Sequence, residues 1–246
     1  MNSGAKNSGA KNSGAIRALV RRELAAFFQS PLAYVAGVVF LLATGTLFFS
    51  TFFLFDRAEM RQFFATLPFM QALLMPALAM RLVAEERRRG TWEVLATLPV
   101  STTGILVAKF LALWITGSAL LIPTLIFVFS VSNLGAVDPG PVAGGYIGAV
   151  LLTGAYGAVG LFASAVSRNE TVALVVGLVI ALTLAILEGF LILLPTALVP
   201  LVQFLGTTYH FAGFTRGVID SRSLVYFASV ILLFLGLADY RLARAR

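Results

Sequence analysis

The sequence predicts an all-α integral membrane protein with six transmembrane helices, and three observations lead to this prediction. Hydrophobic residues make up 59% of the 246 residues, charged residues only 12%, and the mean hydropathy is +0.93. A soluble domain carries about a quarter charged residues. Long apolar runs recur along the chain, and the basic residues flank these runs, as membrane topology requires.

The chain begins with a low-complexity segment, MNSGAKNSGAKNSGA, which repeats one small polar unit. Such a composition buries too little apolar surface to fold, so we expect residues 1–15 to form a disordered tail. The sequence leaves open whether this tail is native or an artefact. Residues 16–246 are assigned to a single transmembrane domain.

An amphipathic helix is predicted over Ile16–Gln29, because its apolar residues recur at helical spacing while arginines occupy the other faces. Two interpretations stay open. The helix lies in the membrane interface with its apolar face among the headgroups, or it packs on another subunit. Ser30 and Pro31 then form a helix cap and a first helical residue, where the chain enters the membrane.

Six apolar segments follow, each near the roughly twenty residues needed to cross the hydrocarbon. They are Leu32–Phe55, Phe64–Val83, Ile105–Phe129, Val142–Val166, Thr171–Leu194 and Leu224–Ala238. The last segment is short, so Ser221 or Arg222 is an alternative start.

The distribution of lysine and arginine predicts the orientation of these spans. With a cytoplasmic amino terminus, 14 of the 18 basic residues fall on the inside and 4 on the outside. This positive-inside bias places both termini in the cytoplasm. The outside stretch Pro195–Arg222 is apolar but interrupted by proline and glycine. It predicts short re-entrant helices that dip into the outer leaflet before the sixth span.

The inside loop between the second and third spans reads AEERRRGTWEVLATLPVSTTGILVAKF, from Ala84 to Phe110. Thr91 is a suitable N-cap and Pro99 a stop, so a short helix is predicted over Trp92–Leu98. Either this is a surface loop without a partner, or it is a docking helix for a soluble subunit. In the second case the anchors would be the apolar side chains, because interface cores favour aromatic and aliphatic groups. These are Trp92, Val94 and Leu95.

The same loop carries a family resemblance. Glu85-Glu86, Gly90-Thr91, Glu93, Leu95, Leu98-Pro99-Val100-Ser101 and Lys109 resemble the signature of ABC-2 type transporter permeases. The resemblance implies a cytoplasmic coupling helix between spans two and three that seats in the ATP-binding subunit. Its docking residues would be Glu85, Glu86, Gly90, Thr91, Trp92, Glu93, Val94 and Leu95. The short chain and its start, RRELAAFFQSPLAYV, are most similar to the gliding-motility branch.

The resemblance also implies partners and a location. These are an ABC ATP-binding subunit, and a second permease copy or a related membrane subunit with an extracytoplasmic domain, in a bacterial inner membrane. Spans two and five commonly line the pathway in such permeases. ATP and Mg would be bound by the partner. This chain contains no G-x-x-x-x-G-K-[ST] loop and no Gly-Lys dipeptide, so we expect no cofactor, no metal and no catalytic residue in it.

Three ionisable residues in or near apolar runs are considered as candidate functional groups. Glu188, in the fifth span, is expected to face the protein interior or a cavity, as a substrate or proton contact or as a structural carboxyl. Lys109 is expected to extend its amine from the inner boundary towards water. His210 has no hydrolase motif around it and is expected to be structural.

Other classes of protein explain the sequence less well. An ion-driven secondary transporter should show inverted repeats and several polar residues at mid-membrane, but Glu188 is the one acid well inside a span. A passive membrane scaffold would share the topology but need no docking helix. No aromatic-basic module for nucleic acid is present. The sequence therefore favours a permease that couples ATP hydrolysis elsewhere to export or mechanical work.

Overall fold

The computed structural model describes residues 4–55, 60–92, 101–135, 137–193, 195–196 and 199–244, and the regular elements in these ranges are all helices. Six helical segments are long and apolar enough to cross a membrane. They are Pro31–Ser50, Arg61–Arg88, Thr102–Ser132, Pro139–Val166, Glu170–Phe190 and Ser221–Ala243. The predicted six spans are therefore confirmed, and the sixth begins at Ser221.

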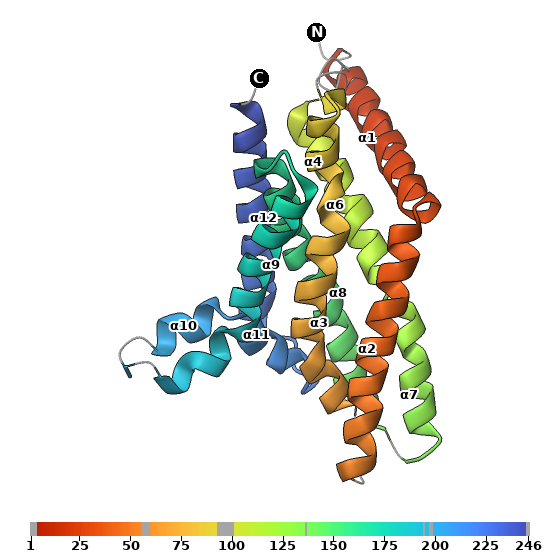
Figure 1. Cartoon of the computed structure of the whole chain (residues 1–246), viewed down its shortest axis with the longest axis vertical. Helices are drawn as coiled ribbons and strands as arrows, with labels where there is room; N and C mark the ends of the chain where they lie inside the picture. The colour runs from red at the N-terminus through yellow and green to blue at the C-terminus, as the bar shows by residue number, and fades with distance from the viewer. Residues whose placement is uncertain are drawn as a thin grey trace.

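The helices run roughly along one axis, with both chain termini at the same end (Figure 1). The first half contains α1 (Gly4–Gln29), α2 (Pro31–Phe55), α3 (Arg61–Ala79), α4 (Arg81–Arg88), α6 (Thr102–Ala119), η1 (Ile122–Thr124) and α7 (Leu125–Ser132). The second half contains α8 (Pro139–Val166), α9 (Glu170–Ile186), η2 (Leu187–Leu193), α10 (Val199–Leu205), α11 (Thr207–Phe214) and α12 (Ser221–Ala243).

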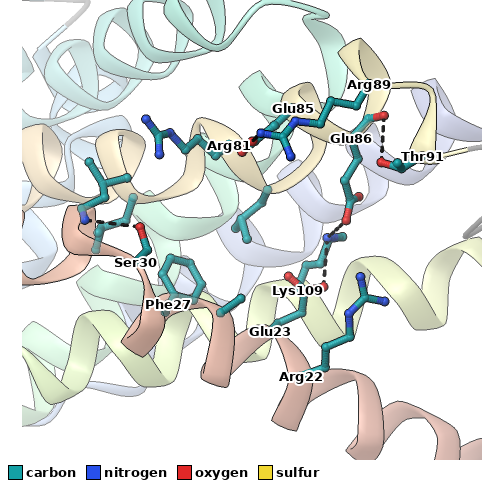
Figure 2. A pocket seen from close by; sticks show the side chains of 14 residues that line it. Arg22, Glu23, Phe27, Ser30, Arg81, Glu85, Glu86, Arg89, Thr91 and Lys109 are labelled. Atoms are coloured by element: carbon teal, nitrogen blue, oxygen red, sulfur yellow. Dashed lines mark hydrogen bonds and ion pairs between the residues drawn. The ribbon is translucent and has the colours of Figure 1, made fainter.

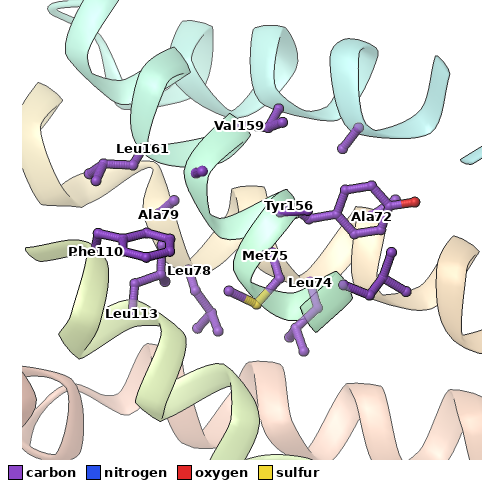
Figure 3. Close-up of a cluster of buried hydrophobic side chains, with 14 of the residues drawn as sticks. Ala72, Leu74, Met75, Leu78, Ala79, Phe110, Leu113, Tyr156, Val159 and Leu161 are labelled. Carbon is purple, nitrogen blue, oxygen red and sulfur yellow. The ribbon is translucent and has the colours of Figure 1, made fainter. Parts of the chain in front are cut away.

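Helix α8 is the centre of the bundle, packed against α3, α6, α9, α11 and α12. Small residues allow this close packing, since a Cβ on Gly160 would lie 3.0 Å from the backbone Cα of Pro76 and 2.7 Å from Cβ of Ala79. The core between α3, α6 and α8 is built from side chains such as Met75, Leu113 and Tyr156 (Figure 3).

Two of the spans are broken helices. The third span, predicted as Ile105–Phe129, contains a break that was not predicted from the sequence, because α6 ends at Ala119 and a 3₁₀ turn containing Pro123 precedes α7. Proline has no N–H to donate, so it disfavours a continuous α-helix at that point. The second span is likewise divided, at Met80, into α3 and α4.

The first helix extends further than the sequence predicts. Its backbone is helical from Gly4, upstream of the predicted start at Ile16, and disorder of residues 1–15 in solution stays a prediction. Leu19 and Phe27 on its apolar face are buried, and α1 packs mainly on α6 of the same chain. Much of this face is therefore covered by protein, while placement of the helix in the membrane interface stays a prediction.

Short helices fill the stretch before the sixth span, as predicted for Pro195–Arg222. Helix α10 projects sideways from the bundle, whereas α11 lies against it (Figure 1). The contacts of α11 include a 2.6 Å hydrogen bond between the hydroxyls of Thr207 and Tyr156 on α8. Entry of these helices into the outer leaflet stays a prediction.

Candidate functional site

A buried cluster of three charged side chains joins α1, α4 and α6. Lys109 Nζ on α6 donates to Glu86 Oε1 on α4 at 2.7 Å and to Glu23 Oε1 on α1 at 3.2 Å. Lys109 is only 1% exposed. The expectation that its amine extends to water is therefore wrong, because two carboxylates from neighbouring helices neutralise it inside the protein.

A cleft of about 520 Å³ opens beside this cluster (Figure 2). It lies between α1 on one side and the α3–α4 segment on the other, at the end of the bundle that holds the termini. Its described lining consists of Arg22, Glu23, Ala26, Phe27, Ser30, Leu32, Leu78, Arg81, Leu82, Glu85, Glu86, Arg89, Thr91 and Lys109.

Ion pairs attach α4 to the start of α9. Glu170, the first residue of α9, pairs with Arg81 at 3.2 Å and with Arg88 at 2.8 Å. Both arginines are about half exposed, so each pair contributes little stability alone, but the shared carboxylate fixes the relative position of two helices. Arg87 adds a 2.6 Å hydrogen bond from Nη1 to the carbonyl of Ala165 at the end of α8.

The junction between α3 and α4 is held by one serine of α8. Ser164 Oγ donates to the carbonyl of Met80 at 2.9 Å and accepts from the amides of Val83 and Ala84 at 3.1 and 3.0 Å. At a helix junction these backbone groups lack intrahelical partners, and burial without a partner would be costly. Ser164 satisfies them and so connects α4 to the central helix.

The predicted docking residues lie just beyond this junction. Glu85 and Glu86 are on α4, and Gly90 has φ +71°, a conformation that favours glycine and lets the chain turn after the helix. Thr91 is exposed, whereas Trp92 is 7% exposed and belongs to the buried hydrophobic cluster. The remaining predicted positions, Glu93, Val94 and Leu95, lie outside the described residues.

Comparison with known proteins decides the family. A family model described as ABC-2 family transporter protein matches residues 56–238, about three quarters of the chain. The chain belongs to this family. It is the membrane permease component of an ABC-2 transporter, a domain without ATPase activity of its own. No curated protein matches the chain.

The family match begins directly after α2 and includes the α4 segment, Lys109, Ser164 and Glu170. Glu23 on α1 lies before it. The permease therefore joins a segment outside the matched region to the family domain through the buried Glu23–Lys109 contact. Sequence reasoning missed this cluster, although Glu23 is the one acidic residue in α1 and Lys109 the one lysine after residue 11.

Glu188 and His210, the other two ionisable residues considered as candidate functional groups, lie away from this cleft, beyond the end of α9 that is opposite Glu170. Glu188 is in η2, immediately after α9, and is half-buried rather than enclosed, with no cation within ion-pair distance in the described ranges. His210 on α11 is 4% exposed, stacks on Tyr226 with ring centroids 3.9 Å apart, and contacts the carbonyl of Phe204 through Nε2 at 3.0 Å. These contacts give His210 a structural role.

The described residues contain no group of three or more histidine, cysteine or acidic side chains that could hold a metal ion. Among their charged groups, Glu23, Glu86, Lys109, Arg81, Arg88 and Glu170 form ion pairs between helices. The arrangement can transmit displacement, since the chain segment that leads to the loop is attached to three different spans.

Proposed function

We propose that this permease couples ATP hydrolysis by a separate ABC subunit to export, or to mechanical work on extracytoplasmic partners. The ATP-binding subunit would dock on the end of α4 and the loop after it, using Glu85, Glu86, Gly90, Thr91, Trp92, Glu93, Val94 and Leu95. ATP and Mg would be bound by that subunit.

The observation that carries this proposal is the attachment of α4. A force applied to the loop acts first on α4, which is bonded to α6 through Lys109, to α8 through Ser164 and to α9 through Glu170. These contacts would carry a displacement of α4 to the spans that it touches.

The proposed orientation places both termini in the cytoplasm of a bacterial inner membrane. It is supported by the 14 to 4 distribution of basic residues and by the position of α4 at the same end of the bundle as both termini (Figure 1). ATP is available on that side. The sequence contains no cysteine, so single introduced cysteines at Thr91 and Asn133 can be tested directly with an impermeant thiol reagent.

The permease is proposed to work with a second copy or a related membrane subunit. Only 22% of the apolar window of α9 is buried within the chain, and Val172, Val175 and Val179 are exposed. An apolar span with so little internal packing is available to another membrane helix. We place the pathway at such an interface, and Glu188, which follows α9, near its far end.

We further propose that the mechanical work is part of a gliding-motility system. It requires a second membrane protein with a large extracytoplasmic domain. Purification in mild detergent followed by mass spectrometry would test it, since that protein should be recovered together with the ATPase. Recovery of a complete transporter without it would leave export as the function and remove the gliding-motility assignment.

The docking role is tested by Thr91→Arg. Thr91 is exposed at the loop, so a long cation there should block docking without disturbing the core. We expect loss of ATPase binding and of ATPase stimulation, with normal membrane insertion. The matched control is Asn133→Arg, which adds the same group at an exposed position directly after α7, at the other end of the bundle (Figure 1). Equal ATPase binding by both variants would contradict the docking site.

A further inference from the structure

The cleft beside α4 lies next to the start of the first candidate span. On one wall, α1 ends at Gln29 and the first span begins at Pro31. On the other wall, α3 gives way to α4 at Met80. The lining thus combines residues before the first span, such as Arg22, with residues inside a span, such as Leu32.

The charge that a ligand meets in this cleft is positive. The side chains of Arg81 and Arg89 are 48% and 65% exposed, and Arg22 is exposed too. The carboxylates are more enclosed, with side-chain exposures of 25% for Glu85 and 17% for Glu86. Guanidinium groups therefore form the accessible rim, whereas the acidic groups lie behind them and are used in internal ion pairs.

Arg22 is the least neutralised member of this rim. Arg81 pairs with Glu170 and Arg89 with Glu85, while Arg22 has no carboxylate within ion-pair distance in the described part of the chain. In Figure 2 its side chain rises from α1 towards the cleft, opposite the arginines of α4. An exposed arginine without a carboxylate partner is suited to a phosphate group.

The membrane-side half of the cleft is apolar. Phe27 and Ala26 from the last turns of α1 and Leu32 from the first turn of α2 line it. This half starts where the first apolar span starts, so hydrocarbon chains of the adjacent leaflet have access to it. A soluble protein segment would meet lipid there, whereas a lipid matches both halves.

We propose that this cleft binds an anionic glycerophospholipid from the leaflet on the side of the termini. Its phosphate is held by Arg22, Arg81 and Arg89, and its acyl chains lie along Phe27 and Leu32. Basic pockets between membrane helices bind anionic headgroups in this way. The bound lipid would bridge α1 and α4, adding to the connection made by the buried Lys109.

The proposal is tested with the full-length protein and dioleoylphosphatidylglycerol. The protein is reconstituted in nanodiscs of phosphatidylcholine with increasing phosphatidylglycerol, and retained lipid is counted by native mass spectrometry. We expect preferential retention of phosphatidylglycerol, weakened by high salt because screening reduces the attraction. Arg22→Gln should weaken it roughly fivefold, the factor expected for one basic group near an anionic lipid surface. Arg22→Lys should retain part of it.

The matched control is Arg21→Gln, which removes a neighbouring exposed arginine outside the cleft. Each variant's thermal unfolding is measured to show that it is folded. Equal phosphatidylglycerol retention by wild type and Arg22→Gln, or an equal loss with Arg21→Gln, would overturn the site. Loss of ATPase binding with unchanged lipid retention in Arg22→Gln would instead assign the cleft to the ATP-binding subunit. Because lipid retention needs no ATPase, failure of the docking proposal would leave this result intact.

Discussion

Replacement of Lys109 by methionine should be among the most destabilising single substitutions in the described part of the permease. Methionine matches the length of the stem but removes the charge. At an effective dielectric constant of about 20, the attraction is about 6 kcal/mol for the contact of 2.7 Å with Glu86 and about 5 kcal/mol for the contact of 3.2 Å with Glu23. Desolvation of three charges offsets most of this gain, at several kcal/mol per ion.

Lys109→Met should nevertheless lower the free energy of unfolding substantially, because two carboxylates remain buried near each other without a cation. Removing one partner from a buried pair costs about 3–5 kcal/mol. For a chain of this size we expect the unfolding temperature in detergent to fall by roughly 6–20 °C. A triple variant that also carries Glu23→Gln and Glu86→Gln should recover most of the loss, since no unpaired charge remains.

Arg17→Met, at an exposed position of α1, is the matched control and should change the free energy of unfolding by less than about 0.5 kcal/mol. A cost below about 1 kcal/mol for Lys109→Met, or no recovery in the triple variant, would refute the buried cluster.

Three further predictions follow from other parts of the fold. Gly160→Ala should lower the free energy of unfolding by about 1–3 kcal/mol, because the added Cβ meets the backbone of α3. Gly236→Ala should be neutral or slightly stabilising, because no atom lies within 4 Å of the added Cβ. Thermal unfolding of the two variants distinguishes them. Burial lowers the pKa of His210, so stability should be complete above about pH 6.5 and decline as the pH falls towards the lower folded-state pKa. His210→Gln should remove that decline in pH-dependent unfolding, and an unchanged decline would assign it to other groups. Glu188→Gln should alter transport or outer-side coupling while leaving assembly intact; a variant that only fails to assemble would give Glu188 a structural role.

The spans could be predicted from sequence because each is a local property. Apolar length and flanking charge suffice for Val142–Val166, and the structure extends it only to Pro139. The cap at Ser30 could also be predicted, since its Oγ accepts from the amide of Leu32; Ser101 Oγ likewise accepts from the amide of Gly104. These interactions involve residues two or three positions apart.

The cluster around Lys109 could not be predicted in the same way. Its partner Glu23 is 86 residues away and Glu86 is 23 residues away, so the contact depends on how α1, α4 and α6 pack. A lone lysine near a membrane boundary extends to water more often than it is buried, and that preference governed the prediction. The break of the third span at Pro123 was visible in the sequence, but prolines also occur inside α3 without dividing it at Pro68 or Pro76.

The most direct test of the account is cross-linking between the permease and its ATPase. The natural chain has no cysteine, so Thr91→Cys provides a single thiol at the loop, and Asn133→Cys a matched thiol at the other end of the bundle. In native membranes, a short reagent that reacts with a thiol at one end and an amine at the other, followed by mass spectrometry, should join Thr91→Cys, but not Asn133→Cys, to a P-loop ATPase. Cross-linking of both positions equally, or of neither in membranes that contain the ATPase, would contradict the claim that this loop connects ATP hydrolysis to the spans.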